Sequence, residues 1–98
     1  MLQDLTPAAL EALMGTPFHI HHGGGQSPLE VVLYEVARHE QHPGPRQEPF
    51  SAYFRGPRAP VLPQQIYPMK HDHLGTLEIF LVPIGPDGQG MRYEAVFN

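Results

Sequence analysis

The sequence predicts a mainly β domain: a small antiparallel six-stranded barrel, or a compact two-sheet sandwich, with one short N-terminal helix. Two observations predict this fold class. Short apolar runs recur through residues 48–98, each bounded by Gly or Pro, which is typical of short strands joined by tight turns. No helical crossover separates consecutive runs, which argues against a parallel α/β fold. A barrel is favoured because closure removes unpaired sheet edges.

Length and composition limit the possible classes of protein. The 98 residues predict one domain, spanning 1–98, and 41% hydrophobic residues exceed the range of disordered chains. The absence of cysteine rules out disulfides and thiolate metal sites. A net charge of -4 with six scattered Lys and Arg residues argues against nucleic-acid binding, and no apolar stretch is long enough to cross a membrane.

The N-terminal region predicts a helix followed by a strand. Thr6 can cap a helix over about residues 6–14, with Pro7 at its first position and good helix formers up to Gly15. Residues 16–22 then alternate apolar side chains with histidines, which indicates the first strand.

Residues 27–41 carry conflicting signals. Ser27 to Glu30 has the form of a capping box, and helical spacing fits the apolar residues that follow. Leu29, Val31 and Leu33 also alternate as in a strand, and the other strands need a partner. We therefore expect a strand here, with a helix as the alternative. A polar loop over residues 39–49 follows, which we expect to be mobile.

The second half of the chain predicts four strands, over Phe50–Phe54, Val61–Tyr67, Leu77–Ile84 and Met91–Phe97. The run Leu77–Ile84 is apolar at nearly every position, so we expect a central strand covered on both faces. Asp87-Gly88 then supplies residues that tolerate positive φ, and predicts a terminal hairpin.

Six blocks occur in order through this half. They are Pro49-Phe50-Ser51, Phe54-Arg55-Gly56-Pro57, Leu62-Pro63-Gln64 with Tyr67, His71 with Leu74-Gly75, Phe80 to Gly85, and Tyr93 to Asn98. Together they resemble a family of small uncharacterised bacterial domains, a domain of unknown function. The resemblance implies an extended structure over residues 28–40 and a short stand-alone protein, encoded in some genomes near genes for phage-tail-like collar proteins. It implies no catalytic or binding residue.

The sharpest chemical signal is His71 and His73 with Glu78. Two histidines at i and i+2 share one face of a strand, and a carboxylate beyond a turn could join them around a divalent transition metal. The spacing resembles the first metal-binding motif of cupins, including the six residues between Glu78 and Gly85. The motif departs from that pattern because Gln65 replaces an expected glycine and no histidine follows His73. The alternative is that His71 bonds across the turn while His73 is solvated.

A second histidine cluster consists of His19, His21 and His22. His19 and His21 share one strand face, opposite Phe18 and Ile20. Such a row could take up a transition metal, but a solvent-facing row is the simpler interpretation.

Two function hypotheses result. The first is a non-enzymatic structural or protein-interaction module without a cofactor, accessory to a phage-tail-like or surface assembly, acting through a protein partner or a homo-oligomer. Its candidate contact residues are Tyr53, Gln64 and Tyr67, together with the 39–49 loop; Gln64 could instead be buried against strand-end backbone. The second is a small cupin-like enzyme using His71, His73 and Glu78. Because the N-terminus lacks a signal peptide, we expect a cytoplasmic protein, with export alongside a tail-like assembly left open.

Overall fold

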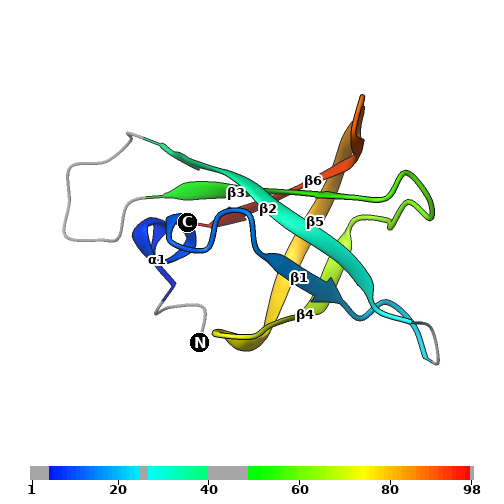
Figure 1. Ribbon diagram of the computed structural model, residues 1–98, viewed down its shortest axis with the longest axis horizontal. Helices are drawn as coiled ribbons and strands as arrows, with labels where there is room; N and C mark the ends of the chain where they lie inside the picture. Colours follow the sequence, from blue (N-terminus) through cyan, green and yellow to red (C-terminus); the bar gives the residue numbers. More distant parts are fainter. Residues whose placement is uncertain (1–4, 25–26, 40–48, 98) are drawn as a thin grey trace.

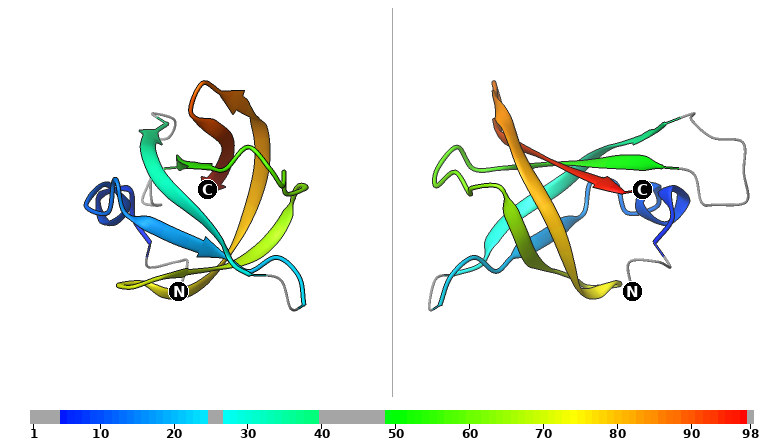
Figure 2. Two further views of the ribbon diagram at one scale, coloured as in Figure 1. Left: turned by 45° about the vertical axis from the view of Figure 1, so that its right-hand side comes forward. Right: turned by 180° about the vertical axis from the view of Figure 1, so that it is seen from behind.

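Six antiparallel strands close into a barrel in the order β1-β2-β3-β6-β5-β4 (Figures 1 and 2). The computed structural model describes residues 5–24, 27–39 and 49–97. The strands are β1 (Pro17–Ile20), β2 (Leu29–Arg38), β3 (Phe50–Gly56), β4 (Gln65–His71), β5 (Gly75–Asp87) and β6 (Gly90–Phe97). The short helix α1 (Pro7–Glu11) lies at the end of the barrel where β6 finishes (Figure 1). The predicted mainly β fold, a six-stranded antiparallel barrel with one short N-terminal helix, is confirmed.

Helix α1 is shorter than the predicted 6–14. Thr6 caps it as expected, since its hydroxyl accepts a hydrogen bond from the Ala9 N–H at 3.0 Å. The helix ends at Glu11 because the chain turns toward β2, where the N–H of Gly15 donates to Leu33 O at 2.8 Å. Leu5 and Leu10 are buried in the core cluster, so α1 covers one end of the barrel.

The conflict over residues 27–41 resolves as the strand β2. Leu29, Val31 and Leu33 are buried on the inner face, as their alternation predicted. β2 pairs with both β1 and β3, and a register shift between Leu33 and Glu35 leaves Tyr34 as an extra residue. The pairing with two neighbours overrides the capping-box signal. Most of the predicted 39–49 loop, residues 40–48, lies outside the described residues.

A packed apolar core fills the inside of the barrel. Phe18 and Phe54 meet edge to face, with ring centroids 5.1 Å apart. Both rings are fully buried. Three further aromatic side chains are also buried in the interior: Phe50, Tyr67 and Tyr93. Among the described helices, none has the length and apolar character to span a membrane.

The fourth strand lies further along the chain than the predicted Val61–Tyr67. β4 begins at Gln65, and residues 57–64 form an irregular connection instead. Prolines at positions 57, 60 and 63 lack the N–H that a sheet ladder needs. The side chain of Tyr93 replaces a strand partner there, because its hydroxyl accepts from the Leu62 N–H at 3.0 Å.

β5 serves two neighbours in succession. Gly75 to Leu81 pairs with β4, and Val82 to Asp87 pairs with β6. The predicted terminal hairpin is present, with Asp87 opposite Gly90. Neither Asp87 nor Gly88 has a positive φ, contrary to expectation. The position that needs glycine is Gly90, whose φ is +152° and whose Cα faces the backbone of Gly56.

Candidate functional site

His71 is the last residue of β4 and points into the barrel end beside α1. Its side chain is only 4% exposed. Its Nδ1 accepts a hydrogen bond from the His73 N–H at 3.0 Å, so Nδ1 carries no proton in the folded state. The proton is therefore on Nε2, which donates to Thr16 Oγ1 at 2.9 Å, and Thr16 in turn donates to Leu13 O at 2.6 Å.

This chain of hydrogen bonds fixes His71 in its neutral form. Burial lowers the pKa of His71, and the nearby His73 lowers it further, while Asp72 opposes the shift. Both ring nitrogens are used within the fold, as expected if His71 bonds across the turn. The imidazole thus ties the β4–β5 turn to the segment between α1 and β1.

Glu78 faces the opposite side of the sheet from His71. It is exposed on the outer face of β5, opposite Pro68 of β4, whereas His71 is buried on the inner face. His73 lies exposed in the turn that joins these strands. Across the described ranges, no three His, Asp or Glu side chains lie close enough together to hold a metal ion. The structure therefore does not bring the predicted trio together.

The histidines of the second cluster, His19, His21 and His22, do not share a common contact. His19 Nε2 lies 3.7 Å from Glu30 Oε1 across the β1–β2 ladder. His22 Nε2 lies 2.9 Å from Ser27 O, and His21 is exposed. Phe18 and Ile20 face the core, so the predicted alternation along β1 is correct.

The three interaction candidates lie in different environments. Tyr53 is half-buried on the outside of β3, and its hydroxyl donates to Glu94 Oε2 at 2.9 Å. Burial, followed by the bond to Glu94, raises the pKa of Tyr53. Gln64 is exposed just before β4, not buried against strand ends. Tyr67 is 2% exposed inside the barrel and donates to Pro63 O, so its ring takes no part in the outer surface.

The outer face of β4 and β5 carries an apolar pair that was not singled out from the sequence. Ile66 and Phe80 are direct cross-strand partners, and they are 59% and 47% exposed. Cross-strand partners have Cβ atoms about 5 Å apart, so the two side chains form one continuous surface. The run Leu77–Ile84 was expected to be covered on both faces; its inner face is covered, and Phe80 is not. We call Ile66 and Phe80 the outer apolar pair.

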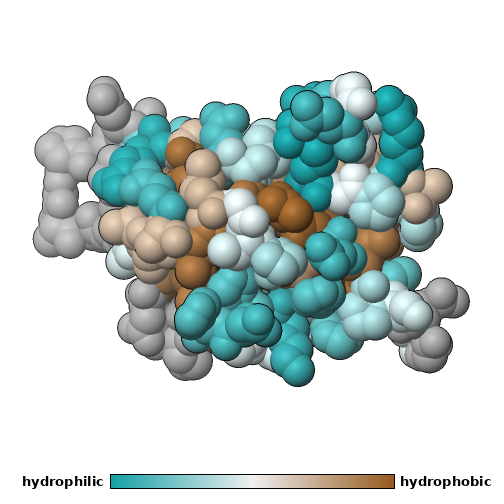
Figure 3. Space-filling model, in the orientation of Figure 1, coloured by the Kyte–Doolittle hydropathy of each residue, from teal (hydrophilic) through white to brown (hydrophobic). Residues whose placement is uncertain are grey.

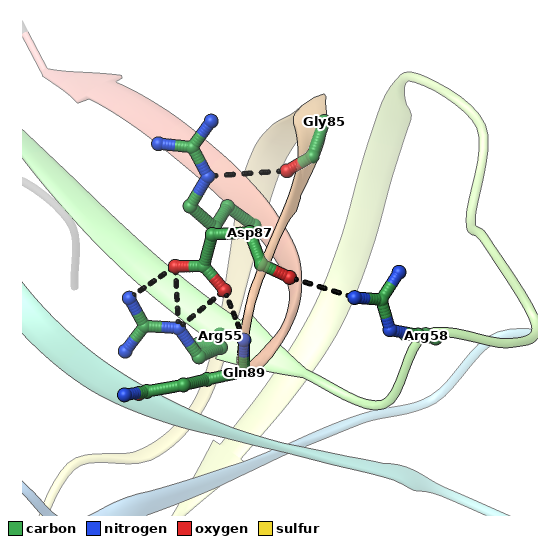
Figure 4. Close-up of polar contacts among 6 residues, drawn as sticks. Arg55, Arg58, Gly85, Asp87 and Gln89 are labelled. Atoms are coloured by element: carbon green, nitrogen blue, oxygen red, sulfur yellow. Dashed lines mark hydrogen bonds and ion pairs between the residues drawn. The ribbon is translucent and has the colours of Figure 1, made fainter.

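A polar network occupies the opposite end of the barrel from α1 (Figure 4). Asp87 accepts from Arg55 through two guanidinium nitrogens, Nε at 3.0 Å and Nη2, and also from the Gln89 N–H at 2.8 Å. These hydrogen bonds lower the pKa of Asp87 to about 2, and the bond from Arg55 has the largest effect. The Arg55 guanidinium also lies 4.0 Å from the ring centroid of Tyr34, which fixes its plane.

Two further arginines join this end of the barrel. Arg58 Nη2 donates to Asp87 O at 3.0 Å, and Arg92 Nε donates to Gly85 O at 3.1 Å. In Figure 3, the end of the molecule that contains the β5–β6 hairpin is strongly hydrophilic, while apolar residues form a band across the middle, over β2. We call Arg55, Arg58, Asp87 and Arg92 the arginine rim.

Fold and surface together define a small closed β-barrel with a filled interior, and its described surface includes an apolar pair on one face and a charged rim at one end. The chain belongs to the family described as Domain of unknown function (DUF6916), which matches residues 5–97. No curated protein and no solved structure is similar enough to this chain to count as a match. Membership agrees with the family resemblance noted in the sequence.

Proposed function

We propose that this barrel is a non-enzymatic protein-interaction module whose partner docks on the outer face of β4 and β5. The observation that carries the proposal is the outer apolar pair. Single exposed apolar residues are common on protein surfaces, but two opposed large ones on adjacent strands form a patch that water solvates poorly. Covering this patch on association would be favourable, at about 25 cal/mol per Å² of apolar area removed from water.

The interior of the barrel supports a role at the surface. Aromatic and aliphatic side chains fill it, as in other small barrels whose inward-facing residues form a core. The buried polar groups serve internal hydrogen bonds: His71 with Thr16, Ser51 with His39, and Tyr93 with Leu62. Each of these bonds stabilises the fold, so the residues that are free to make contacts lie outside.

The partner we propose is a component of a phage-tail-like or surface assembly, or a second copy of this chain within one. The support is the family resemblance, which places related genes near those of collar proteins in some genomes. A small rigid barrel suits such a role, since an accessory subunit needs a fixed docking face and no reaction centre.

The test is co-purification from the native host, comparing the unaltered protein with the double variant Ile66→Thr/Phe80→Thr. Threonine keeps a β-branched side chain suited to a strand while removing most of the apolar surface. The matched control is Val61→Thr, which alters another exposed apolar residue outside the β4–β5 face. We expect the unaltered protein and the control to enrich the same partner, and the double variant to lose it.

Light scattering of the purified protein addresses the second-copy form of the proposal. A dimer that the double variant turns into a monomer, and that Val61→Thr leaves intact, would place the interface on this face. The proposal is overturned if the unaltered protein is monomeric and enriches nothing that the double variant lacks. If the captured proteins include no tail-like or surface component, the proposed assembly is wrong while the docking face stands.

A further inference from the structure

The arginine rim concentrates positive charge in an acidic chain. The sequence has six Lys and Arg residues and a net charge of -4, yet Arg55, Arg58 and Arg92 all meet around the β5–β6 turn. They come from β3, from the connection after β3, and from β6. Three cations, two of them close in sequence and the third on β6, are thus held at one end of the barrel, in a chain whose net charge is negative.

The carboxylate of the rim, Asp87, is already paired with Arg55. Asp87 Oδ2 accepts from both Nε and Nη2 of Arg55, and Nε also lies 3.3 Å from Oδ1. Glu94, the next outward-facing carboxylate along β6 from Arg92, accepts its bond from Tyr53. Neither carboxylate makes an ion pair with Arg58 or Arg92 within the described part of the chain.

Arg58 and Arg92 are positioned but not neutralised. Each donates one hydrogen bond to a backbone carbonyl, which orients the guanidinium without cancelling its charge. A guanidinium has five N–H donors, so about four on each side chain remain for an outside acceptor. Arg58 is exposed and Arg92 is half-buried, and both are anchored to a rigid hairpin.

The anchoring carbonyls hold the two arginines at neighbouring points of β5. Gly85 and Asp87 are two residues apart on β5, a rise of about 7 Å along a strand. Their carbonyl groups turn to opposite sides of the strand, the one of Asp87 toward Arg58 (Figure 4). A ligand with two acidic groups can offer one carboxylate to each guanidinium.

We propose that the arginine rim binds an acidic segment of a partner protein, one that offers at least two Asp or Glu carboxylates to Arg58 and Arg92. This inference rests on the proposed interaction function and names the chemistry of the partner. A protein segment fits better than nucleic acid, because a nucleic-acid backbone requires an extended basic face and this chain is acidic elsewhere.

The test uses fluorescence anisotropy with a labelled peptide of alternating Glu and Ser. The matched control peptide carries Gln in place of Glu, and a labelled single-stranded oligonucleotide represents the competing polyanion. We expect the Glu peptide to bind at low ionic strength, the Gln peptide not to bind, and the affinity to fall as salt is added.

Variants assign the binding to the rim. Arg58→Gln and Arg92→Gln should each weaken peptide binding roughly threefold to tenfold, and Lys70→Gln, which removes an exposed cation of β4, should leave it unchanged. Arg92→Lys keeps the charge and should retain most of the affinity. Because Arg58 is exposed, Arg58→Gln tests the rim even if the hairpin tolerates no change at Arg92.

Two results would overturn the inference: a Glu peptide that binds no better than the Gln peptide, or binding that Lys70→Gln weakens as much as Arg58→Gln. Tighter binding of the oligonucleotide would assign the rim to nucleic acid instead. The Ile66→Thr/Phe80→Thr variant keeps the rim intact and should bind the peptide normally. If that variant loses the native partner while Arg58→Gln has no effect on peptide binding, the inference about the arginine rim is wrong and the docking face on β4 and β5 stands.

Discussion

His71 Nε2 lies 2.9 Å from Thr16 Oγ1, and this hydrogen bond joins the end of β4 to the segment between α1 and β1. The Thr16 hydroxyl donates a hydrogen bond to Leu13 O, so it is both an acceptor and a donor. The bond holds the turn after α1 against the barrel.

Thr16→Val should lower the free energy of unfolding by about 1–3 kcal/mol, because the buried Nε2–H of His71 then has no acceptor. Valine keeps the shape and the strand preference of threonine. Urea unfolding followed by circular dichroism measures the loss. Thr76→Val, at an exposed position of β5, is the control and should change stability by less than about 0.5 kcal/mol. Equal stability of the two variants would show that the hydrogen bond is not stabilising.

Stability should also fall as the pH drops below 6.5, the ordinary pKa of histidine. The pKa of His71 is lowered in the folded state, so the unfolded chain takes up a proton that the folded chain resists. The groups facing the ring are Thr16, Phe18 and His73, with Asp72 nearby, and none of them forms a hydrogen-bonded ion pair with a charged His71.

Urea midpoints at about pH 7.5 and about pH 5.5 measure this effect. In His71→Gln the titrating group is gone, so its deficit against the unaltered protein should shrink at the lower pH. His21→Gln, at an exposed site, should follow the unaltered protein. A constant deficit of His71→Gln at both pH values would contradict the assignment.

Gly90→Ala should destabilise the barrel by about 2 kcal/mol or more. A Cβ at this position would overlap the carbonyl oxygen of Gly56, and φ of +152° is strained for any other residue. Gly88→Ala lies in the same turn, has open space around it and should have little effect. Thermal unfolding of the two variants provides the comparison, and equal melting temperatures would refute the steric argument.

Tyr93→Phe should cost about 1–3 kcal/mol, because it leaves the buried Leu62 N–H without an acceptor. Tyr67→Phe should cost less, since Pro63 is exposed and its carbonyl can bind water instead. Urea unfolding of both variants gives the order. The reverse order would mean that the connection over residues 57–64 is held mainly by Tyr67.

Arg55→Gln should raise the pKa of Asp87 from about 2 toward 3.8, because the bond from Arg55 is the main cause of the lowered value. The stabilisation linked to this carboxyl is present above pH 3.8 and is lost as the pH falls toward 2. An NMR titration of the Asp87 carboxyl carbon measures the shift. Arg58→Gln is the control, because Arg58 contacts only the backbone of Asp87. Identical titrations in the two variants would contradict the prediction.

Local alternation was enough to predict most of the barrel. Phe50, Ala52 and Phe54 face inward as their spacing indicated, and so do the alternate residues of β2. Local rules failed where a distant side chain decided the outcome. The strand expected from Val61 is replaced by a connection that Tyr93 holds from β6, thirty-one residues along the chain from Leu62.

The surface features depended on contacts that spacing cannot reveal. Arg55 and Arg58 are close in sequence, but Asp87 and Arg92 reach them only once β3 and β6 pair. The sequence did not predict the exposure of Phe80 for a similar reason. An apolar run indicates burial, but it does not show whether a second layer covers the outer face of the sheet. The spacing of the histidine motif could not show that His71 is buried on the inner face of the sheet while Glu78 is exposed on the outer face.

The pairing of β5 with both β4 and β6 also bears on the order in which the strands can pair during folding. Its connections to β4 and β6 are tight turns, so residues 65–97 form a meander of local pairings that can nucleate early. Joining β1 to β4 pairs Ile20 with Met69, which are far apart in the sequence, so we expect this pairing to form after the meander. During synthesis, β1 and β3 therefore leave the ribosome before β4 and β6, their second partners, and the barrel can close only after the C-terminal meander has emerged.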